Sequence, residues 1–209
     1  GMLYRGGYLN RRTGVLDGNS LTDFGRGILR DELGVRAEID LRTSGWDDIL
    51  ASDPDKTPQT ENFIDPSLPY YKCTITQYDL IFGNAQSKSN IAKIFSLLAD
   101  EENYPVYIHC NAGADRTGTI YTLIHGILGV SEEDATRDFE LTSFSTMGTR
   151  LRDEVQQNDN MNYVAYGKFM NTLKGFSPSG DFNEGVENYV KSLGVTGEEI
   201  SAIRNILLE

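Results

Sequence analysis

The apolar positions of the first hundred residues recur at two different periods, which predicts helices and strands in turn. Behind a capping signal at Ser20, apolar residues recur at helical spacing and end at Gly34, so we expect a helix over 20–33. Residues 35–41 alternate between apolar and polar, as in a strand with one buried face. The pattern further predicts a strand over 70–75, a helix over 84–98 and a buried strand over 105–108.

The rest of the chain is predicted to be mostly helical. Ser131 and Thr196 each precede acidic residues at capping-box spacing and begin helical patterns. Four of the six prolines fall within residues 44–69, where we expect a long irregular insertion. Strand and helix alternation followed by helices predicts a single α/β domain over 1–209, with a helical C-terminal part over 131–209.

Charge and composition narrow the classes of partner. The chain has 31 acidic and 19 basic residues and a net charge of −12, which argues against nucleic-acid binding and against stable association with an anionic membrane. Its longest apolar stretch, residues 120–130, is far shorter than the roughly 20 residues that span a bilayer. We expect a monomer. The first residues show no signal-peptide pattern, but a signal peptide could have been removed ahead of them, so the compartment stays open between cytoplasm and secretion.

The cysteine and histidine counts exclude several kinds of site. Two cysteines, Cys73 and Cys110, cannot form a disulfide framework or an all-cysteine metal site. Two histidines cannot build a histidine-rich metal site. The sequence therefore predicts chemistry without a metal or cofactor.

One short segment carries the candidate chemistry. Residues 109–118, HCNAGADRTG, lie between a predicted strand and the start of a helical pattern. There, backbone N–H groups and the positive end of the helix would converge on one point, which suits a phosphate-sized dianion. Arg116 adds a planar guanidinium that can bind two phosphoryl oxygens. The same positive environment favours the thiolate of Cys110, a nucleophile facing phosphorus.

Neighbouring residues would support this site. Gly113 would give the loop backbone freedom, and Gly118 would let the helix pack closely on the strand. Thr117 could donate its hydroxyl to the thiolate, and His109 could orient the loop. An inert buried cysteine with an arginine nearby is the alternative, but the fixed offsets of the whole string favour the functional interpretation.

Residues 109–118 resemble the signature loop of the cysteine-dependent protein tyrosine phosphatase superfamily. The similarity is greatest to its bacterial tyrosine/serine phosphatase branch, in which an Asp precedes the loop Arg, as Asp115 does here. Weaker similarity covers residues 3–5, 39–43, 138–142, 193–196 and 198–200. The resemblance implies a central mixed sheet with helices on both faces, Cys110 as nucleophile and Arg116 as phosphate clamp. The predicted substrate-binding residues are His109, Asn111, Ala112, Gly113, Ala114, Thr117, Gly118 and Arg42.

Two departures from that branch affect the expected activity. The branch commonly has Lys where this chain has Ala114, so a cation suited to highly charged phosphoinositides is missing. The Asn-Phe-Arg-Asp-Leu-Gly-Gly-like segment that usually precedes the position of Leu3 is also missing from this sequence. The first departure makes lipid phosphatase activity less favoured.

Departure of the leaving group requires a proton, and three carboxylic acids are candidates for its source. Asp79 lies between a predicted strand and the helix over 84–98, where related phosphatases place a mobile acid loop. Asp115 lies in the signature loop itself, and Asp65, in the insertion, is a weaker candidate. A surface Asp is the alternative for each, and the sequence does not choose between Asp79 and Asp115.

Three further features have two interpretations each, and a fourth, His125, has one. Cys73, on a strand that could lie beside that of Cys110, is either a buried structural thiol or a redox partner of Cys110. Arg42 lies near the site by resemblance, or forms a surface ion pair. His125 is expected to be a packed core residue. The insertion over 44–69, with Trp46 and Phe63, is either a lid over the substrate or a solvated connector.

These features predict a phosphomonoesterase that acts through a cysteinyl-phosphate on phosphotyrosine in proteins or peptides, either alone or with dual specificity. A small-molecule or phosphoinositide phosphatase is one alternative. A phosphate-binding pseudophosphatase is the other, although Cys110, Arg116 and Thr117 are all present.

Overall fold

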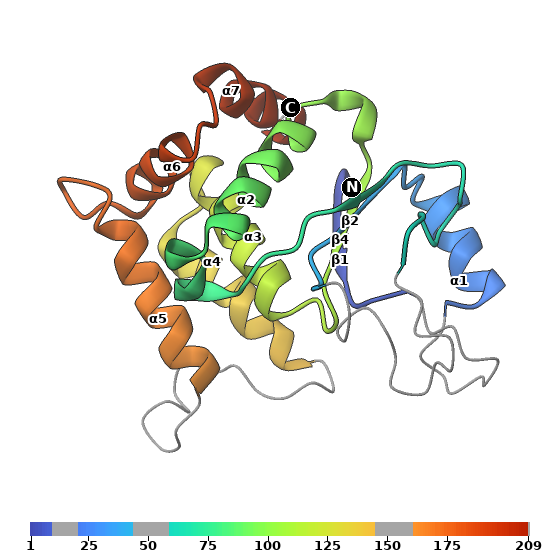
Figure 1. Ribbon diagram of the computed structural model, residues 1–209, viewed down its shortest axis with the longest axis horizontal. Helices are drawn as coiled ribbons and strands as arrows, with labels where there is room; N and C mark the ends of the chain where they lie inside the picture. Colours follow the sequence, from blue (N-terminus) through green and yellow to red (C-terminus); the bar gives the residue numbers. More distant parts are fainter. Residues whose placement is uncertain (10–20, 44–58, 145–160, 209) are drawn as a thin grey trace.

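The computed structural model describes residues 1–9, 21–43, 59–144 and 161–208 (Figure 1). Its centre is a sheet of four strands in the order β1-β4-β2-β3, which are β1 (Leu3–Gly6), β2 (Ala37–Asp40), β3 (Tyr70–Lys72) and β4 (Val106–His109). All pairings among these strands are parallel, in place of the mixed sheet that the resemblance implied. Every connection between them is long enough to cross over the sheet, as parallel pairing requires. The predicted α/β class is confirmed.

Helices follow the strands and fill the C-terminal part. They are α1 (Asp23–Gly27), α2 (Ala85–Leu98), α3 (Asp115–Ile127), α4 (Glu132–Leu141), α5 (Met161–Lys174), α6 (Phe182–Ser192) and α7 (Gly197–Leu208). Shorter turns of other helix types are η1 (Ile28–Glu32), η2 (Tyr78–Gly83), η3 (Glu101–Asn103) and η4 (Thr142–Phe144). None of the helices in the described ranges has the length and apolarity needed to cross a bilayer.

The sheet is covered on both faces, as expected. Figure 1 shows α1 on one side of the sheet and α2 to α7 on the other. Side chains of β4 alternate accordingly, because Tyr107 packs in the smaller core under α1, whereas Val106 and Ile108 belong to the larger core under the helices of the other face. The larger core continues without a break from the sheet to Ile200 and Ile203 of α7.

Local capping explains which element boundaries were predicted correctly. The side chains of Asn84 and Ser131 accept hydrogen bonds from the first turns of α2 and α4, and the predicted starts of these helices are confirmed. The expected helix over 20–33 begins later, because Thr22 is the capping residue, and it changes to a π-helix at Ile28. Strand β1 was not predicted, since four residues are too few to show an alternating pattern.

The predicted insertion is described only from residue 59 onward, and its segment 44–58, with Trp46, lies outside the described residues. Residues 59–69 form no regular helix or strand, as expected. Phe63 packs toward α1, where the Arg26 guanidinium lies 5.3 Å from the centre of its ring. Its backbone N–H donates to the buried carboxylate of Glu38. This part of the insertion is therefore fixed to the fold.

Candidate functional site

The signature loop lies at the carboxyl edge of the parallel sheet. Cys110 follows β4, whose last residue, His109, is level with Gly6 of β1 and Asp40 of β2. Parallel sheets bind their ligands at this edge. Helix α3 begins five residues after Cys110, and no side chain caps its N-terminus at Ala114. The predicted strand, loop and helix are confirmed, and the arrangement suits an anion.

The loop backbone is fixed from outside at three carbonyl groups. The carbonyl of Cys110 lies 3.2 Å from Nδ1 of His109, and that of Asn111 accepts from the N–H of Tyr8 at 3.1 Å. The carbonyl of Gly113 accepts from Nη2 and Nε of Arg5, at 2.8 and 3.3 Å. Gly113 has φ +69°, which confirms its need for backbone freedom. The loop therefore has a defined curl before any ligand binds.

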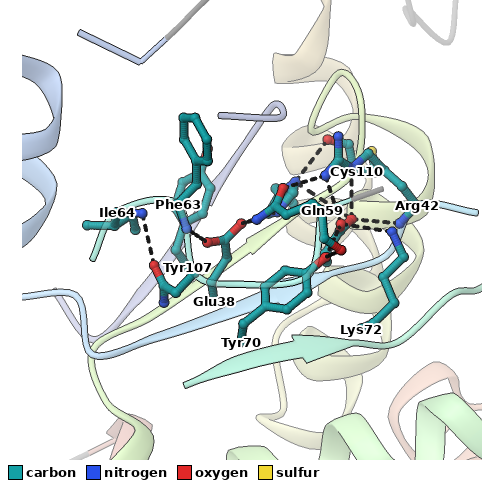
Figure 2. Close-up of polar contacts among 12 residues, drawn as sticks. Glu38, Arg42, Gln59, Phe63, Ile64, Tyr70, Lys72, Tyr107 and Cys110 are labelled. Carbon is teal, nitrogen blue, oxygen red and sulfur yellow. Dashed lines mark hydrogen bonds and ion pairs between the residues drawn. The ribbon is translucent and has the colours of Figure 1, made fainter. Parts of the chain in front are cut away.

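His109 connects the loop to the buried carboxylate of Glu38, which is labelled in Figure 2. Its Nε2 lies 2.9 Å from Oε1 of Glu38, and both side chains are fully buried. The same oxygen of Glu38 accepts from Nε2 of Gln59 at 2.7 Å. Both ring nitrogens of His109 thus face oxygen atoms, one on Glu38 and one on Cys110, which fixes the orientation of the ring. This geometry agrees with the orienting role predicted for His109.

Arg42 is buried beside Asp40, so the alternative of a surface ion pair is wrong. Its Nε and Nη2 donate to the two oxygens of Asp40 at 2.9 and 2.8 Å, and Nη2 also donates to Gln59 at 2.7 Å. Lys72 adds a contact of 3.0 Å to Asp40. Burial alone would raise the pKa of Asp40, but its electrostatic interactions with His109, Arg42 and Lys72 outweigh burial and hold that pKa well below its usual range.

The two leading acid candidates lie at one junction, where η2 meets the start of α3. The hydroxyl of the buried Tyr78 donates to the carboxylate of Asp115, and the Tyr78 N–H donates to Thr119 at 2.9 Å. Asp79 is the next residue and is half-buried. Asp65, the third candidate, binds the backbone and hydroxyl of Ser67 in a local turn, which lowers its pKa. The structure thus brings Asp79 and Asp115 together.

The remaining loop residues occupy the first turn of α3. Arg116 is half-buried there, six positions after Cys110. Thr117 is fully buried, and its hydroxyl has no hydrogen-bond partner among the described residues. The predicted hydrogen bond from Thr117 to Cys110 is therefore not formed in this structure, and the role of Thr117 stays a prediction.

The packing reason predicted for Gly118 is wrong. A Cβ atom there would meet only Nη2 of Arg5, at an ordinary 3.5 Å. The close approach of α3 occurs instead at Gly126, where a Cβ would lie 2.5 Å from Cβ of Val186 on α6. Gly118 is thus compatible with a side chain on packing grounds.

Cys73 is not beside the strand of Cys110. Strand β2 lies between β3 and β4, and Cys73 N–H donates to the carbonyl of Asp40 on β2. Two strand spacings place the Cα atoms about 9–10 Å apart, whereas a disulfide allows at most about 7 Å. Cys73 is fully buried, and burial raises the pKa of its thiol to about 11. The structural interpretation of Cys73 fits these facts.

His125 lies in the last turn of α3 and packs edge-on to the ring of Tyr121. Burial lowers its pKa, and its Nδ1 is buried without a hydrogen-bond partner among the described residues. It is half-buried rather than fully enclosed. The expected core position is therefore met only in part, because the ring packs on Tyr121 but is not enclosed.

A cavity of about 340 Å³ adjoins the outer side of the loop. Its walls are Arg5, Gly6, Ala112, Gly113, Asp138, Leu141 and Thr142. Within the described ranges, no three His, Cys, Asp or Glu side chains gather as possible metal ligands.

The sequence analysis missed several residues that shape the site. Arg5, Glu38, Gln59, Tyr78 and Asp138 contact the loop or its neighbours through hydrogen bonds that join distant segments. The similarity of segments 3–5 and 138–142 to the phosphatase branch was the one available signal, and it pointed to Arg5 and Asp138 without giving them a role.

The chain is similar to several known proteins. A curated tyrosine-protein phosphatase from Nostoc commune is 25% identical over 205 residues, which cover 88% of this chain and 69% of that protein. The core catalytic domain of the PP-IP phosphatase SIW14 from S. cerevisiae, solved with citrate, has a TM-score of 0.47 at 15% identity, covering 79% of this chain and 87% of that one. A second structure of the Siw14 catalytic core has a TM-score of 0.43 at 15% identity, over 70% of this chain and 82% of the other.

The broadest match is to a family model. The model described as the tyrosine phosphatase family matches residues 2–209, and this range includes β4, the loop from Cys110 to Arg116, and α3. With its signature loop at the carboxyl edge of a parallel sheet and a family match over nearly its full length, the chain belongs to the tyrosine phosphatase family.

Proposed function

We propose that this protein tyrosine phosphatase hydrolyses phosphomonoesters through a phosphocysteine formed at Cys110. The observation that carries the proposal is the position of Cys110 and Arg116 at the two ends of one loop, whose carbonyl groups at residues 110, 111 and 113 are engaged from outside. The thiolate attacks phosphorus, the bond from phosphorus to the ester oxygen breaks, and that oxygen takes a proton from a carboxylic acid. Water then attacks phosphorus, returns a proton to the carboxylate and releases phosphate and the thiolate.

Arg116 is proposed to bind two oxygens of the phosphoryl group, with the loop N–H groups of residues 111–114 on the others. The hydroxyl of Thr117, which has no hydrogen-bond partner among the described residues, would donate to the Cys110 thiolate when that thiolate is released from phosphorus. Arg42 would support the site without contacting the phosphoryl group, because two of its donor atoms are already bound to Asp40 and Gln59.

For the proton donor, we favour Asp79 over Asp115. The hydroxyl of Tyr78 occupies one oxygen of Asp115, whereas the carboxylate of Asp79 has no hydrogen-bond or ion-pair partner within the described part of the chain. Asp115 would instead align the start of α3 with η2. Asp79→Asn is expected to slow hydrolysis of phenyl phosphate far more than that of p-nitrophenyl phosphate, because the better leaving group needs less protonation. Equal losses for the two substrates in Asp79→Asn, with selective loss in Asp115→Asn, would reverse the assignment.

The substrate class is proposed to be phosphorylated proteins or peptides, with phosphotyrosine preferred. Ala114 in place of a lysine and the net charge of −12 both disfavour highly anionic phosphoinositides. Turnover of phosphotyrosine, phosphoserine and phosphothreonine peptides, beside phosphoinositide vesicles, measures this preference. Phosphotyrosine hydrolysis should be fastest, and fastest hydrolysis of the lipid would contradict the proposed class.

The first test is hydrolysis of p-nitrophenyl phosphate in the presence of a chelator. Cys110→Ser should abolish turnover, and Cys73→Ser is the matched control that should keep it. Rapid quenching followed by mass spectrometry should find one phosphoryl group on the peptide that contains Cys110. If the native chain binds phosphate but turns over no aryl, seryl or lipid phosphate, it is a binding module and the proposal fails.

A further inference from the structure

Arg5 holds the outer side of the loop, at a distance of 108 residues along the chain from its partner Gly113. Its Nη2 and Nε both reach the Gly113 carbonyl, at 2.8 and 3.3 Å. Its third nitrogen, Nη1, forms an ion pair with Asp138 of α4. The face of the guanidinium lies 4.8 Å from the centre of the Tyr121 ring on α3. One side chain thus connects β1, the loop, α3 and α4.

Arg5 binds the carbonyl of the peptide unit between Gly113 and Ala114, and a peptide unit next to a glycine can rotate easily. Gly113 has φ +69°, and glycine reaches such conformations and their alternatives at little cost. In a trans peptide, the carbonyl and the following N–H point in opposite directions. With the Gly113 carbonyl held by Arg5 outside the loop, the N–H of Ala114 must therefore point to the opposite side.

The same strand segment binds a second carbonyl in the same way. The N–H of Tyr8 donates to the Asn111 carbonyl at 3.1 Å, which turns the N–H of Ala112 away from Tyr8. Gly6 lies directly behind Gly113, because a Cβ on Gly113 would come within 2.5 Å of the Gly6 backbone. Residues 5–8 thus back the loop along its outer side.

We propose that Arg5, held by Asp138, is a positioning residue that keeps the Gly113 carbonyl out of the phosphate site. This inference rests on the proposed function of the loop. Without Arg5, the 113–114 peptide can flip and present a carbonyl oxygen, in place of an N–H, to the phosphoryl group. The flip replaces an N–H group, which attracts the negative phosphoryl oxygens, with a carbonyl oxygen, which repels them.

The test measures the affinity for inorganic phosphate by calorimetry in the Cys110→Ser background, and kcat and KM for p-nitrophenyl phosphate with Cys110 intact. Arg5→Met should weaken phosphate binding about tenfold or more, the scale of one lost hydrogen bond to a charged group. Arg5→Lys keeps the charge and one donor and should restore part of the affinity.

Asp138→Asn separates positioning from a general effect of charge. If Arg5 acted only through its positive field, removing the negative charge of Asp138 would tighten phosphate binding. If Arg5 acts by position, loss of its ion pair lets the guanidinium move, and Asp138→Asn should weaken phosphate binding. The two accounts predict opposite signs.

Arg204→Met is the matched control. Arg204 also joins a backbone carbonyl, that of Ile127 at 2.7 Å, to a carboxylate, that of Glu187 at 2.7 Å, but at the far end of α3. Its loss should lower the melting temperature, as loss of Arg5 should, and leave phosphate affinity unchanged.

The outcomes distinguish this inference from the proposed function. Native phosphate affinity in Arg5→Met, or tighter binding in Asp138→Asn, overturns the positioning role even when the native chain is an active phosphatase. Absence of turnover by the native chain overturns the proposed function, and the phosphate affinities still decide the role of Arg5.

Discussion

Four ionisable side chains are buried behind Cys110, which is unusual for residues of this kind. Glu38, Asp40, Arg42 and His109 are at most 1% exposed, and each has hydrogen bonds that replace lost water. Their contacts bind β2, β4 and residue 59 to one another at the edge of the sheet where the loop begins. At the residue scale, this cluster supports the start of the loop at Cys110, and Figure 2 shows Glu38, Arg42 and Cys110 among these contacts.

Asp40→Asn should destabilise the fold by about 3–5 kcal/mol at neutral pH, because Arg42 loses its buried counter-charge. The pKa of Asp40 is lower in the folded state than in the unfolded chain, so its contribution is present above the unfolded pKa of about 4 and is lost as pH falls below it. The stability gap between native and variant should therefore begin to narrow below about pH 5 and keep narrowing as the pH falls toward the folded pKa, which lies well below the usual range. Urea unfolding at several pH values measures it, and a gap that widens on acidification would contradict this account.

The two cysteines should differ sharply in reactivity. Burial raises the pKa of Cys73 to about 11, so its thiol stays protonated at neutral pH and titrates only as pH approaches that value. Brief treatment of the native protein with iodoacetamide at neutral pH should modify Cys110 and spare Cys73, with phosphate slowing the reaction. Peptide mass spectrometry measures both sites. Equal labelling of the two cysteines in folded protein would show that the environment of Cys73 is misassigned.

At the scale of elements, the two ends of α3 contact different parts of the molecule. Its start receives the loop and packs against η2, whereas its later turns pack against α6 through Gly126. Contact between α3 and α6 is close because Gly126 has no side chain to separate them from Val186. The position of α3 thus depends on α6, in the C-terminal part of the chain.

Gly126→Ala should destabilise the protein by about 1–3 kcal/mol, since the new Cβ would lie 2.5 Å from Val186, which is fully buried. Adding Val186→Ala should recover part of the loss. Gly167→Ala is the control, because a Cβ there meets nothing within 4 Å and should stabilise α5 by about 0.5–1 kcal/mol. Thermal unfolding measures all three, and equal effects of the two alanines would refute the packing argument.

At the scale of the whole molecule, one core joins the sheet to the C-terminal helices. The larger buried cluster includes Ile39 and Ile108 of the sheet, Phe95 of α2, Phe169 of α5 and Ile203 of α7. Tyr166 stacks on Phe139 with ring centres 4.0 Å apart, which joins α5 to α4. This continuity supports the prediction of a single domain.

The whole chain should therefore unfold in a single cooperative step. Far-ultraviolet circular dichroism, which follows the helices, and near-ultraviolet circular dichroism, which follows the packed tyrosines, should give coincident transitions. A first transition that removes helical signal while tyrosine packing persists would mean that the C-terminal helices form a unit of their own.

Much of the fold was predictable because its signals are local. Asn84 and Ser131 cap helices within their own segments, and the buried run of residues 106–108 forms β4 as expected. The mixed sheet and the neighbouring position of Cys73 were wrong for a common reason. Strand order and direction depend on which distant segments pair, and β2 rather than β3 lies beside β4.

The sequence by itself determined the signature loop, since the proposed nucleophile Cys110, the glycine that turns the backbone and the arginine all lie within residues 110–116. The order of elements around this loop is a strand, a glycine and the start of a helix. Because these signals are consecutive in the chain, the loop can be identified from the sequence without knowledge of any distant residue. Only the tertiary structure decided what holds the loop: Arg5 on one side, Glu38 through His109 on another, and Tyr78 at Asp115. Those partners are 37 to 108 residues away along the chain. Such contacts form only when the chain folds, so hydrophobic periodicity and motif spacing do not predict them.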